Sequence, residues 1–93
     1  MVPARCREIL VHLTKNGPGT VSDIEIALRV FVQGDVLRHL GILCEVGLVT
    51  KIPNPADNSD PLYGLDPLTP ASQTEEGVVL DFTFALFRLE YGL

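Results

Sequence analysis

The fold of this chain is decided by the stretch VLRHLGILCEVGLV, residues 36–49. Within it, Val36, Leu40 and Leu43 recur at i, i+4 and i+7, which is the spacing of one apolar face on a helix. Gly47 follows the last of them, and a glycine just past a helix commonly ends it. The stretch therefore predicts a helix that stops near Gly47 and leads into the strand-like residues 48–52.

A shorter helix is predicted just before this one. Ser22 stands three residues ahead of Glu25, which is the spacing of a capping box, and the preceding Thr20-Val21 fit a single bridge of strand. The apolar face of this helix is expected to consist of Ile24, Ala27 and Leu28. The connection at 30–32 is very short, and two short helices joined in this way are a helix-turn-helix candidate.

The flanking segments extend this pattern on both sides. A first helix is predicted over residues 3–15, and the turn residues 16–19 end it. Its apolar stripe consists of Cys6, Ile9, Leu10 and Leu13. Residues 48–52 and 62–65 favour strand, and the segment between them is dense in Pro, Asn, Asp and Ser, which favour turns. This part predicts a hairpin with a long loop.

Residues 69–93 form the last segment, which fits two kinds of secondary structure. Thr69-Pro70 and the pair Ser72 and Glu75 are helix-start signals, whereas the alternation over 80–86 also fits a strand. We favour a helix because of the caps. A helix that is apolar on two sides must bury both, so we expect it to pair with a second copy of the chain. The residues expected at this dimer interface are Val79, Phe82, Leu86 and Leu89.

The order is therefore helix, helix, turn, helix, hairpin, helix, and residues 36–49 contain an Arg-His-Leu triplet and a Gly-Leu-Val exit. In these features the chain resembles the winged helix-turn-helix regulators of the ArsR and MarR families. The resemblance implies an α+β, mainly α fold: a three-helix core plus a β-hairpin wing, with a C-terminal dimerisation helix. We expect a single domain over 1–93, with core and wing in 1–68 and the dimerisation helix in 69–93.

The resemblance also implies a DNA-binding site. In these families the helix after the turn enters the major groove, and the wing touches the neighbouring DNA. Carried over by position, Gln33 is expected to bond an adenine edge and Arg38 a guanine edge or a phosphate. The expected DNA-binding residues are Gln33, Gly34, Asp35, Leu37, Arg38, His39, Gly41 and Lys51. Among them, His39 is expected at the DNA backbone and Lys51 at the base of the wing.

The charge of the chain is unusual for such a protein. Seven basic and twelve acidic side chains give a formal net charge of −5. Residues 20–52 hold only three bases (Arg29, Arg38 and Lys51) against four acids, and the expected wing tip adds Asp57 and Asp60. Affinity for DNA comes largely from neutralising phosphates, so this distribution of charge is unfavourable for DNA binding.

Other classes of function find little support in the residues. The chain contains no glycine-rich phosphate loop, nucleophile elbow or HExxH motif, so we expect no enzyme. Cys6 and Cys44 belong to no CxxC or His/Cys cluster, and we expect two half-buried thiols in a reducing compartment, with no metal and no cofactor. No apolar run reaches the ~18–20 residues of a membrane span, and we expect a cytoplasmic protein without membrane contact.

Two hypotheses for the function remain. Because 46% of the residues are hydrophobic and only 20% are charged, some apolar residues must be exposed or lie at an interface. The first hypothesis is a homodimeric transcription regulator whose partners are double-stranded DNA and a second copy of the chain. The alternative is a winged-helix protein-interaction module that binds no DNA and uses Leu37, Ile42 and the apolar tail as contacts.

Overall fold

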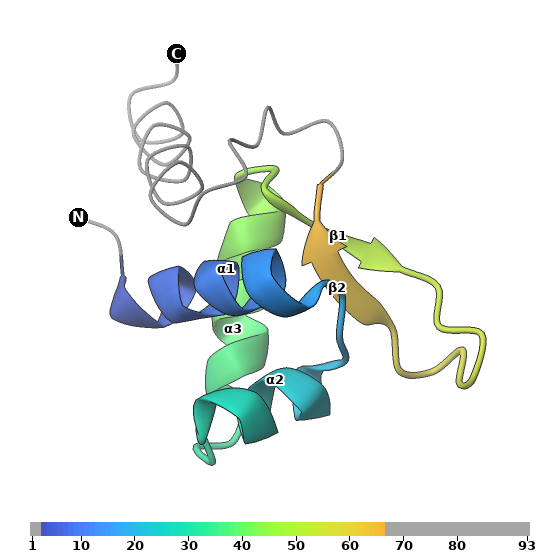
Figure 1. Cartoon of the computed structure of the whole chain (residues 1–93), viewed down its shortest axis with the longest axis horizontal. Coiled ribbons are helices and arrows are strands. Elements are labelled where there is room, and N and C mark those ends of the chain that lie inside the picture. Colours follow the sequence, from blue (N-terminus) through green and yellow to red (C-terminus); the bar gives the residue numbers. More distant parts are fainter. Residues whose placement is uncertain (1–2, 67–93) are drawn as a thin grey trace.

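The computed structural model describes residues 3–66, in which three helices pack together and a β-hairpin projects to one side (Figure 1). The elements are α1 (Ala4–Asn16), α2 (Val21–Leu28), α3 (Asp35–Glu45), β1 (Val49–Ile52) and β2 (Leu62–Leu65). This order confirms the predicted helix-turn-helix core and hairpin wing. The predicted helix in 69–93, with its dimer contacts at Val79, Phe82, Leu86 and Leu89, lies outside the described residues.

The core lies where α1 crosses α3, with α2 on one side and the hairpin on the other (Figure 1). All the apolar positions predicted for the faces of α1 and α3 are buried: Cys6, Ile9, Leu10, Leu13, Val36, Leu40 and Leu43. The prediction for α2 is partly wrong, because Ala27 is exposed while Ile24 is buried. The thiol of Cys6 is fully buried rather than half-buried, whereas Cys44 is half-buried as expected.

The start of α2 differs from the predicted capping box. Thr20, and not Ser22, is the N-cap: the Asp23 N–H donates to Thr20 Oγ1, and the Thr20 N–H donates back to Asp23 Oδ2, each over 3.1 Å. The bridge of strand forms one residue earlier than predicted, at Gly19, whose backbone pairs with Tyr63 in both directions. Because this pairing holds the chain extended up to Gly19, the helix begins directly after it.

The helices α2 and α3 end with the same backbone arrangement. After α2, the Val30 N–H donates to the Glu25 carbonyl over 3.0 Å, and Arg29 adopts a left-handed conformation with φ 57°. After α3 an equivalent bond forms, and Gly47 is the left-handed residue with φ 84°. Gly34, with φ 80°, precedes α3 in the same region of φ. These residues make the turn between α2 and α3 short and send the chain from α3 directly into the hairpin.

The hairpin is a two-stranded antiparallel sheet whose long loop is held by its own side chains. Asn54 Nδ2 donates to the Asp60 carbonyl over 2.9 Å, and Asp57 Oδ1 accepts from the N–H of Ser59 over 2.9 Å and from its hydroxyl over 2.7 Å. These two hydrogen bonds from Ser59 lower the pKa of Asp57. The loop therefore has a defined shape, and an ionised carboxylate lies within it.

Candidate nucleic-acid interface

Most of the residues predicted to contact DNA are exposed on the turn, on α3 and on the hairpin. Gln33 and Gly34 are exposed in the turn, and Lys51 is exposed on β1. On α3, the side chain of Arg38 is 72% exposed and Leu37 is 51% exposed. A third position on α3, Gly41, is also exposed, and apart from its chain neighbours and the backbone of its own helix no described atom lies within 4 Å of where its Cβ would be. The structure thus leaves the outer side of α3 accessible.

Asp35 differs from the other predicted contact residues because its carboxylate is already engaged. Arg5 of α1 donates from Nε to Asp35 Oδ2 over 2.7 Å and from Nη1 to Glu8 Oε2 over 2.6 Å. The hydrogen bond from the Arg5 guanidinium lowers the pKa of Asp35. Arg38 Nη2 also lies 3.5 Å from Asp35 Oδ1. The carboxylate therefore ties α1 to the first turn of α3 and offsets part of the charge of Arg38.

His39 lies one turn after Asp35, and its side chain is only 12% exposed. Its Nδ1 is 2.7 Å from the Asp35 carbonyl oxygen. Because a carbonyl oxygen only accepts, Nδ1 carries the hydrogen and donates it. A contact between His39 and a DNA phosphate would therefore use Nε2, and Nε2 can donate to a phosphate only when the ring is protonated.

Sequence reasoning missed a set of exposed apolar side chains at the end of α2 and in the turn. Phe31 is 79% exposed, and Val32 and Ile26 are each 68% exposed. We call these three residues, together with Leu37 of α3, the exposed apolar set. The sequence contained one signal for it, because the connection at 30–32 has three apolar residues in a row and the core takes only Val30.

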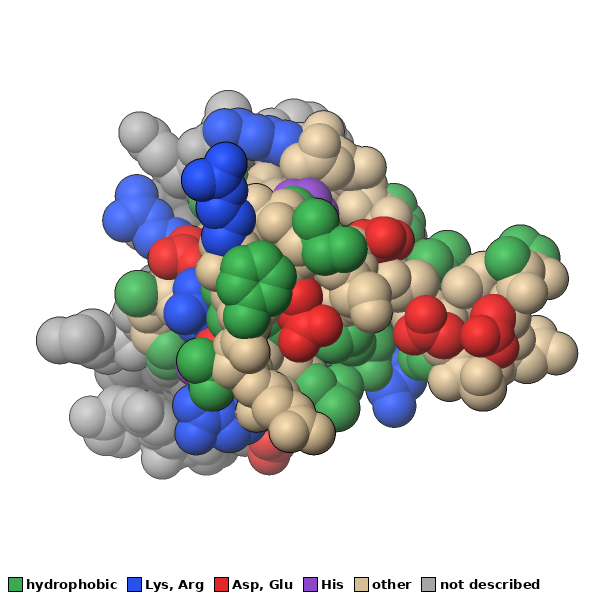
Figure 2. Space-filling view, turned by 90° about the horizontal axis from the view of Figure 1, so that it is seen from below, with side chains coloured by type: hydrophobic (Ala, Val, Ile, Leu, Met, Phe, Trp, Pro, Cys, Tyr) green, Lys and Arg blue, Asp and Glu red, His purple; other side chains and the backbone are tan. Residues whose placement is uncertain are grey.

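Charge is unevenly distributed around this set. Figure 2, which views the molecule from the side of α2 and the turn, shows hydrophobic side chains in the middle of the face. Acidic side chains lie on the projecting hairpin, and most of the lysine and arginine side chains gather on the opposite side of the view. The hairpin is therefore the acidic end of this surface, whereas wing tips that contact DNA are better served by cations.

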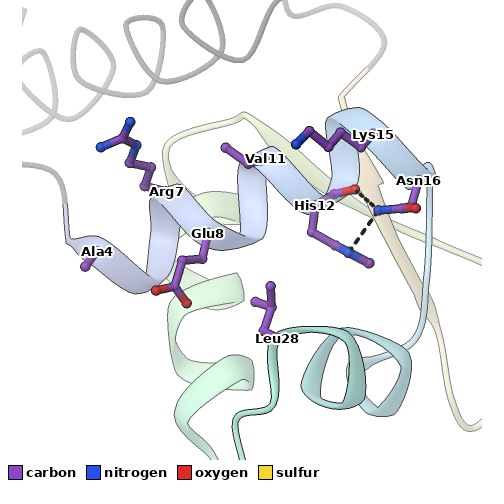
Figure 3. A pocket seen from close by; sticks show the side chains of 8 residues that line it. All are labelled: Ala4, Arg7, Glu8, Val11, His12, Lys15, Asn16 and Leu28. Carbon is purple, nitrogen blue, oxygen red and sulfur yellow. Dashed lines mark hydrogen bonds between the residues drawn. The ribbon is translucent and has the colours of Figure 1, made fainter.

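A separate groove of about 610 Å³ runs along α1 (Figure 3). In it His12 points toward Leu28 of α2, and Asn16 Nδ2 donates to both the ring Nδ1 and the carbonyl of His12. None of the predicted DNA-contact residues lines it. The lining residues are Ala4, Arg7, Glu8, Val11, His12, Lys15, Asn16 and Leu28.

Within residues 3–66, no group of three His, Cys, Asp or Glu side chains could hold a metal ion. No helix of this same range has the length and apolar composition that crossing a membrane requires.

Several solved structures are similar to this chain. A mutant of MarR from E. coli matches with a TM-score of 0.71 and 24% identity over 99% of this chain. The transcriptional regulator Tm0710 from Thermotoga maritima matches with a TM-score of 0.66 and 20% identity over 97%. BpsR from Bordetella bronchiseptica, whose DNA binding is regulated by 6-hydroxynicotinic acid, matches with a TM-score of 0.65 and 19% identity over 98%. At these identities the likeness establishes the fold, which is the winged helix of MarR, as the sequence predicted.

The chain is shorter than these solved proteins. It spans 66% of the MarR chain, 64% of the BpsR chain and 59% of the Tm0710 chain. No protein-family model matches the sequence, and no curated protein matches it.

Proposed function

We propose that this chain is a sequence-specific DNA-binding transcription regulator that acts in the cytoplasm as a homodimer, with α3 of each copy in the major groove. The observation that carries the proposal is the accessible outer side of α3, where Leu37, Arg38 and Gly41 are exposed. The fold supports it as well, because chains of similar structure include a transcriptional regulator and a protein whose DNA binding is regulated.

Each proposed contact has its own chemistry. The amide of Gln33 can exchange two hydrogen bonds with an adenine edge, and Arg38 can donate to a guanine edge or a phosphate. Lys51, exposed on β1, adds a phosphate contact beside the groove. Asp35 acts indirectly, because its carboxylate is bound by Arg5 and would repel a phosphate; it holds α3 in place and limits the positions of Arg38.

A homodimer would compensate for the small number of cations. One copy offers three bases between residues 20 and 52, and a second copy doubles them. We propose that the copies pair through residues 69–93, using Val79, Phe82, Leu86 and Leu89. Two α3 helices would then reach half-sites about one helical turn apart, ~34–36 Å. Sedimentation equilibrium tests this step, and a monomer at micromolar concentration would contradict the dimer while leaving DNA binding open.

The test of DNA binding compares two arginines. Arg38→Ala removes the proposed reader on α3, and Arg7→Ala removes the same charge from the groove along α1. Fluorescence anisotropy with genomic duplexes at low salt should show Arg38→Ala weakening binding by about 10-fold or more, as the loss of one base or phosphate contact does. Arg7→Ala should change affinity by less than about 3-fold. Equal effects of the two variants, or no DNA binding by the wild type, would contradict the proposal.

A second candidate function is a protein-interaction module that binds no DNA. The exposed apolar set favours it, because soluble monomers rarely leave several large apolar side chains uncovered on one face. The acidic hairpin loop beside that face also suits a basic protein better than a phosphate backbone. A stoichiometric protein complex that Phe31→Ser disrupts, together with the absence of DNA binding, would support this function over the first.

A further inference from the structure

The outer side of α3 and the turn before it expose more large apolar side chains than charged ones. Phe31 and Val32 in the turn and Leu37 on α3 are all more than half exposed, whereas the neighbouring Val36 and Leu40 are fully buried. Three large apolar side chains are therefore left in water on α3 and in the turn before it. Leaving so much apolar surface uncovered is unfavourable, so a partner that removes it from water is expected.

The same surface is poor in groups that read guanine. Helix α3, Asp35–Glu45, contains one arginine and no lysine. That residue, Arg38, lies 3.5 Å from Asp35 Oδ1, so part of its charge is already offset. Arginine or lysine bonded to guanine is the commonest specific contact in the major groove, and here it depends on one side chain.

The major groove presents one apolar group, the C5-methyl of thymine, and apolar side chains are the ones that contact it. The same A·T base pair presents an adenine edge that Gln33 can bond in a bidentate manner. Gly41, four residues after Leu37, carries no side chain, and nothing described outside its own stretch of helix backbone lies within 4 Å of the position that a Cβ would take. The backbone of α3 can therefore approach a groove closely at this position, which brings Leu37 within reach of the bases.

We infer that the chain selects A·T-rich sites by packing Leu37, with Phe31 and Val32, against thymine methyl groups. This inference rests on the proposed function and names the chemistry of its target. Binding should then depend on buried methyl groups more than on arginine-guanine contacts. It should also depend on salt less steeply than in regulators rich in cations, because few phosphates are neutralised.

The experiment starts from the full chain and a pool of random DNA duplexes, from which bound sequences are selected at low salt. The best sequence is then made with thymine and with uracil, which differ only in the C5-methyl group. Uracil should weaken binding by about 4-fold for each methyl group that the protein buries, the factor expected for one apolar group of this size. Leu37→Ala should show a smaller difference between the two duplexes than the wild type, because one of the three packing side chains is lost; an unchanged difference would contradict the inference.

Ile26→Ala is the matched control, because Ile26 is 68% exposed and lies on α2 rather than on α3. It should keep the full difference between thymine and uracil. If wild type binds both duplexes equally, or selects G·C-rich sites, the inference is overturned while the proposed function stands. If no duplex in the pool is bound, the proposed function itself fails. A protein complex that both Leu37→Ala and Ile26→Ala weaken, without DNA binding, would overturn both in favour of a protein partner.

Discussion

Arg5 of α1 and Asp35 of α3 are 30 residues apart in the sequence and are joined by an ion pair of 2.7 Å between Nε and Oδ2. Asp35 is the first residue of α3, where a negative charge is also favoured by the helix dipole. The carboxylate thus stabilises the crossing of α1 and α3. At the same time it places a negative charge on the helix that we propose enters the DNA groove, so stability and DNA affinity should respond to it in opposite directions.

Stability should fall in acid because of this pair. The hydrogen bond from Arg5 lowers the pKa of Asp35 below the value of about 3.9 that it has in an unfolded chain. The ionised carboxylate therefore stabilises the fold above about pH 4, and this contribution is lost as the pH falls through the folded pKa. Urea denaturation at a series of pH values should show a smaller acid-induced loss for Asp35→Asn than for the wild type. Parallel profiles would contradict this assignment, since Asp57 titrates in both proteins.

Asp35→Asn should also strengthen DNA binding. The change removes one negative charge from α3 and leaves the charge of Arg38 without its carboxylate neighbour 3.5 Å away. A unit charge about 7 Å from a phosphate in water corresponds to about a 3-fold change in affinity. Anisotropy titrations at low salt should show an increase of about this size, and it should shrink in high salt. An unchanged or lower affinity in a folded Asp35→Asn protein would show that Asp35 lies away from the DNA.

The start of α2 allows a direct comparison of two hydroxyl residues. Thr20 caps the helix through the 3.1 Å bond to the Asp23 N–H, whereas Ser22 is exposed in the first turn. Thr20→Ala should lower the free energy of unfolding by about 1 kcal/mol, the usual value of an N-cap. Ser22→Ala should change it by less than about 0.5 kcal/mol. Chemical denaturation measures both, and a larger effect at Ser22 would favour the capping box that the sequence alone suggested.

Arg29 is a position where a substitution should raise stability. It is left-handed with φ 57°, a conformation that costs a residue with a Cβ about 1 kcal/mol and costs glycine little. Arg29→Gly should therefore raise the free energy of unfolding by up to about 1 kcal/mol. Gly47→Ala is the reverse control at φ 84°, and it should lower stability by a similar amount. A destabilised Arg29→Gly would mean that the arginine side chain makes a contribution larger than this strain.

The two cysteines should differ strongly in reactivity. Burial raises the pKa of Cys6 to about 11, so about one thiol in a thousand is ionised at pH 8. Burial also raises the pKa of Cys44, but this thiol is only half-buried and can meet a reagent. Under native conditions a thiol reagent should therefore modify one cysteine, identified as Cys44 by mass spectrometry. Cys6 should react only when the chain is unfolded, and modification of both at one rate would contradict the buried placement of Cys6.

The sequence predicted the elements that follow from short-range patterns. The apolar spacing of Val36, Leu40 and Leu43 is visible within a few turns of one helix, and burial of these residues follows from it directly. The loop of the hairpin was predicted in the same way, from turn-forming residues that are close together in the sequence. For the candidate interface, the exposed positions on α3 followed from the same spacing, because residues between the buried ones must face outward.

What the sequence could not predict depends on contacts between distant residues. Both Thr20 and Ser22 stand three residues before an acid, and the choice between them was made by the pairing of Gly19 with Tyr63, far along the chain. The bond between Arg5 and Asp35 also joins residues that are distant in the sequence, so nothing in the sequence indicated that the Asp35 carboxylate is already bound. Phe31 and Val32 of the exposed apolar set were missed because apolar residues outside a helical pattern carry no local sign of where they point.

The hairpin loop is braced by the bonds of Asn54 and Ser59, and it carries Asp57 and Asp60. The two bonds from Ser59 hold the Asp57 carboxylate in place, so its repulsion of phosphates would act on every stretch of DNA alike. The protein would dissociate quickly from non-specific DNA and stay bound only where contacts to the bases offset this repulsion. A genome offers many competing non-specific sites, and quick release from them shortens the search for the few correct ones. A low affinity for non-specific DNA would in this way contribute to sequence specificity.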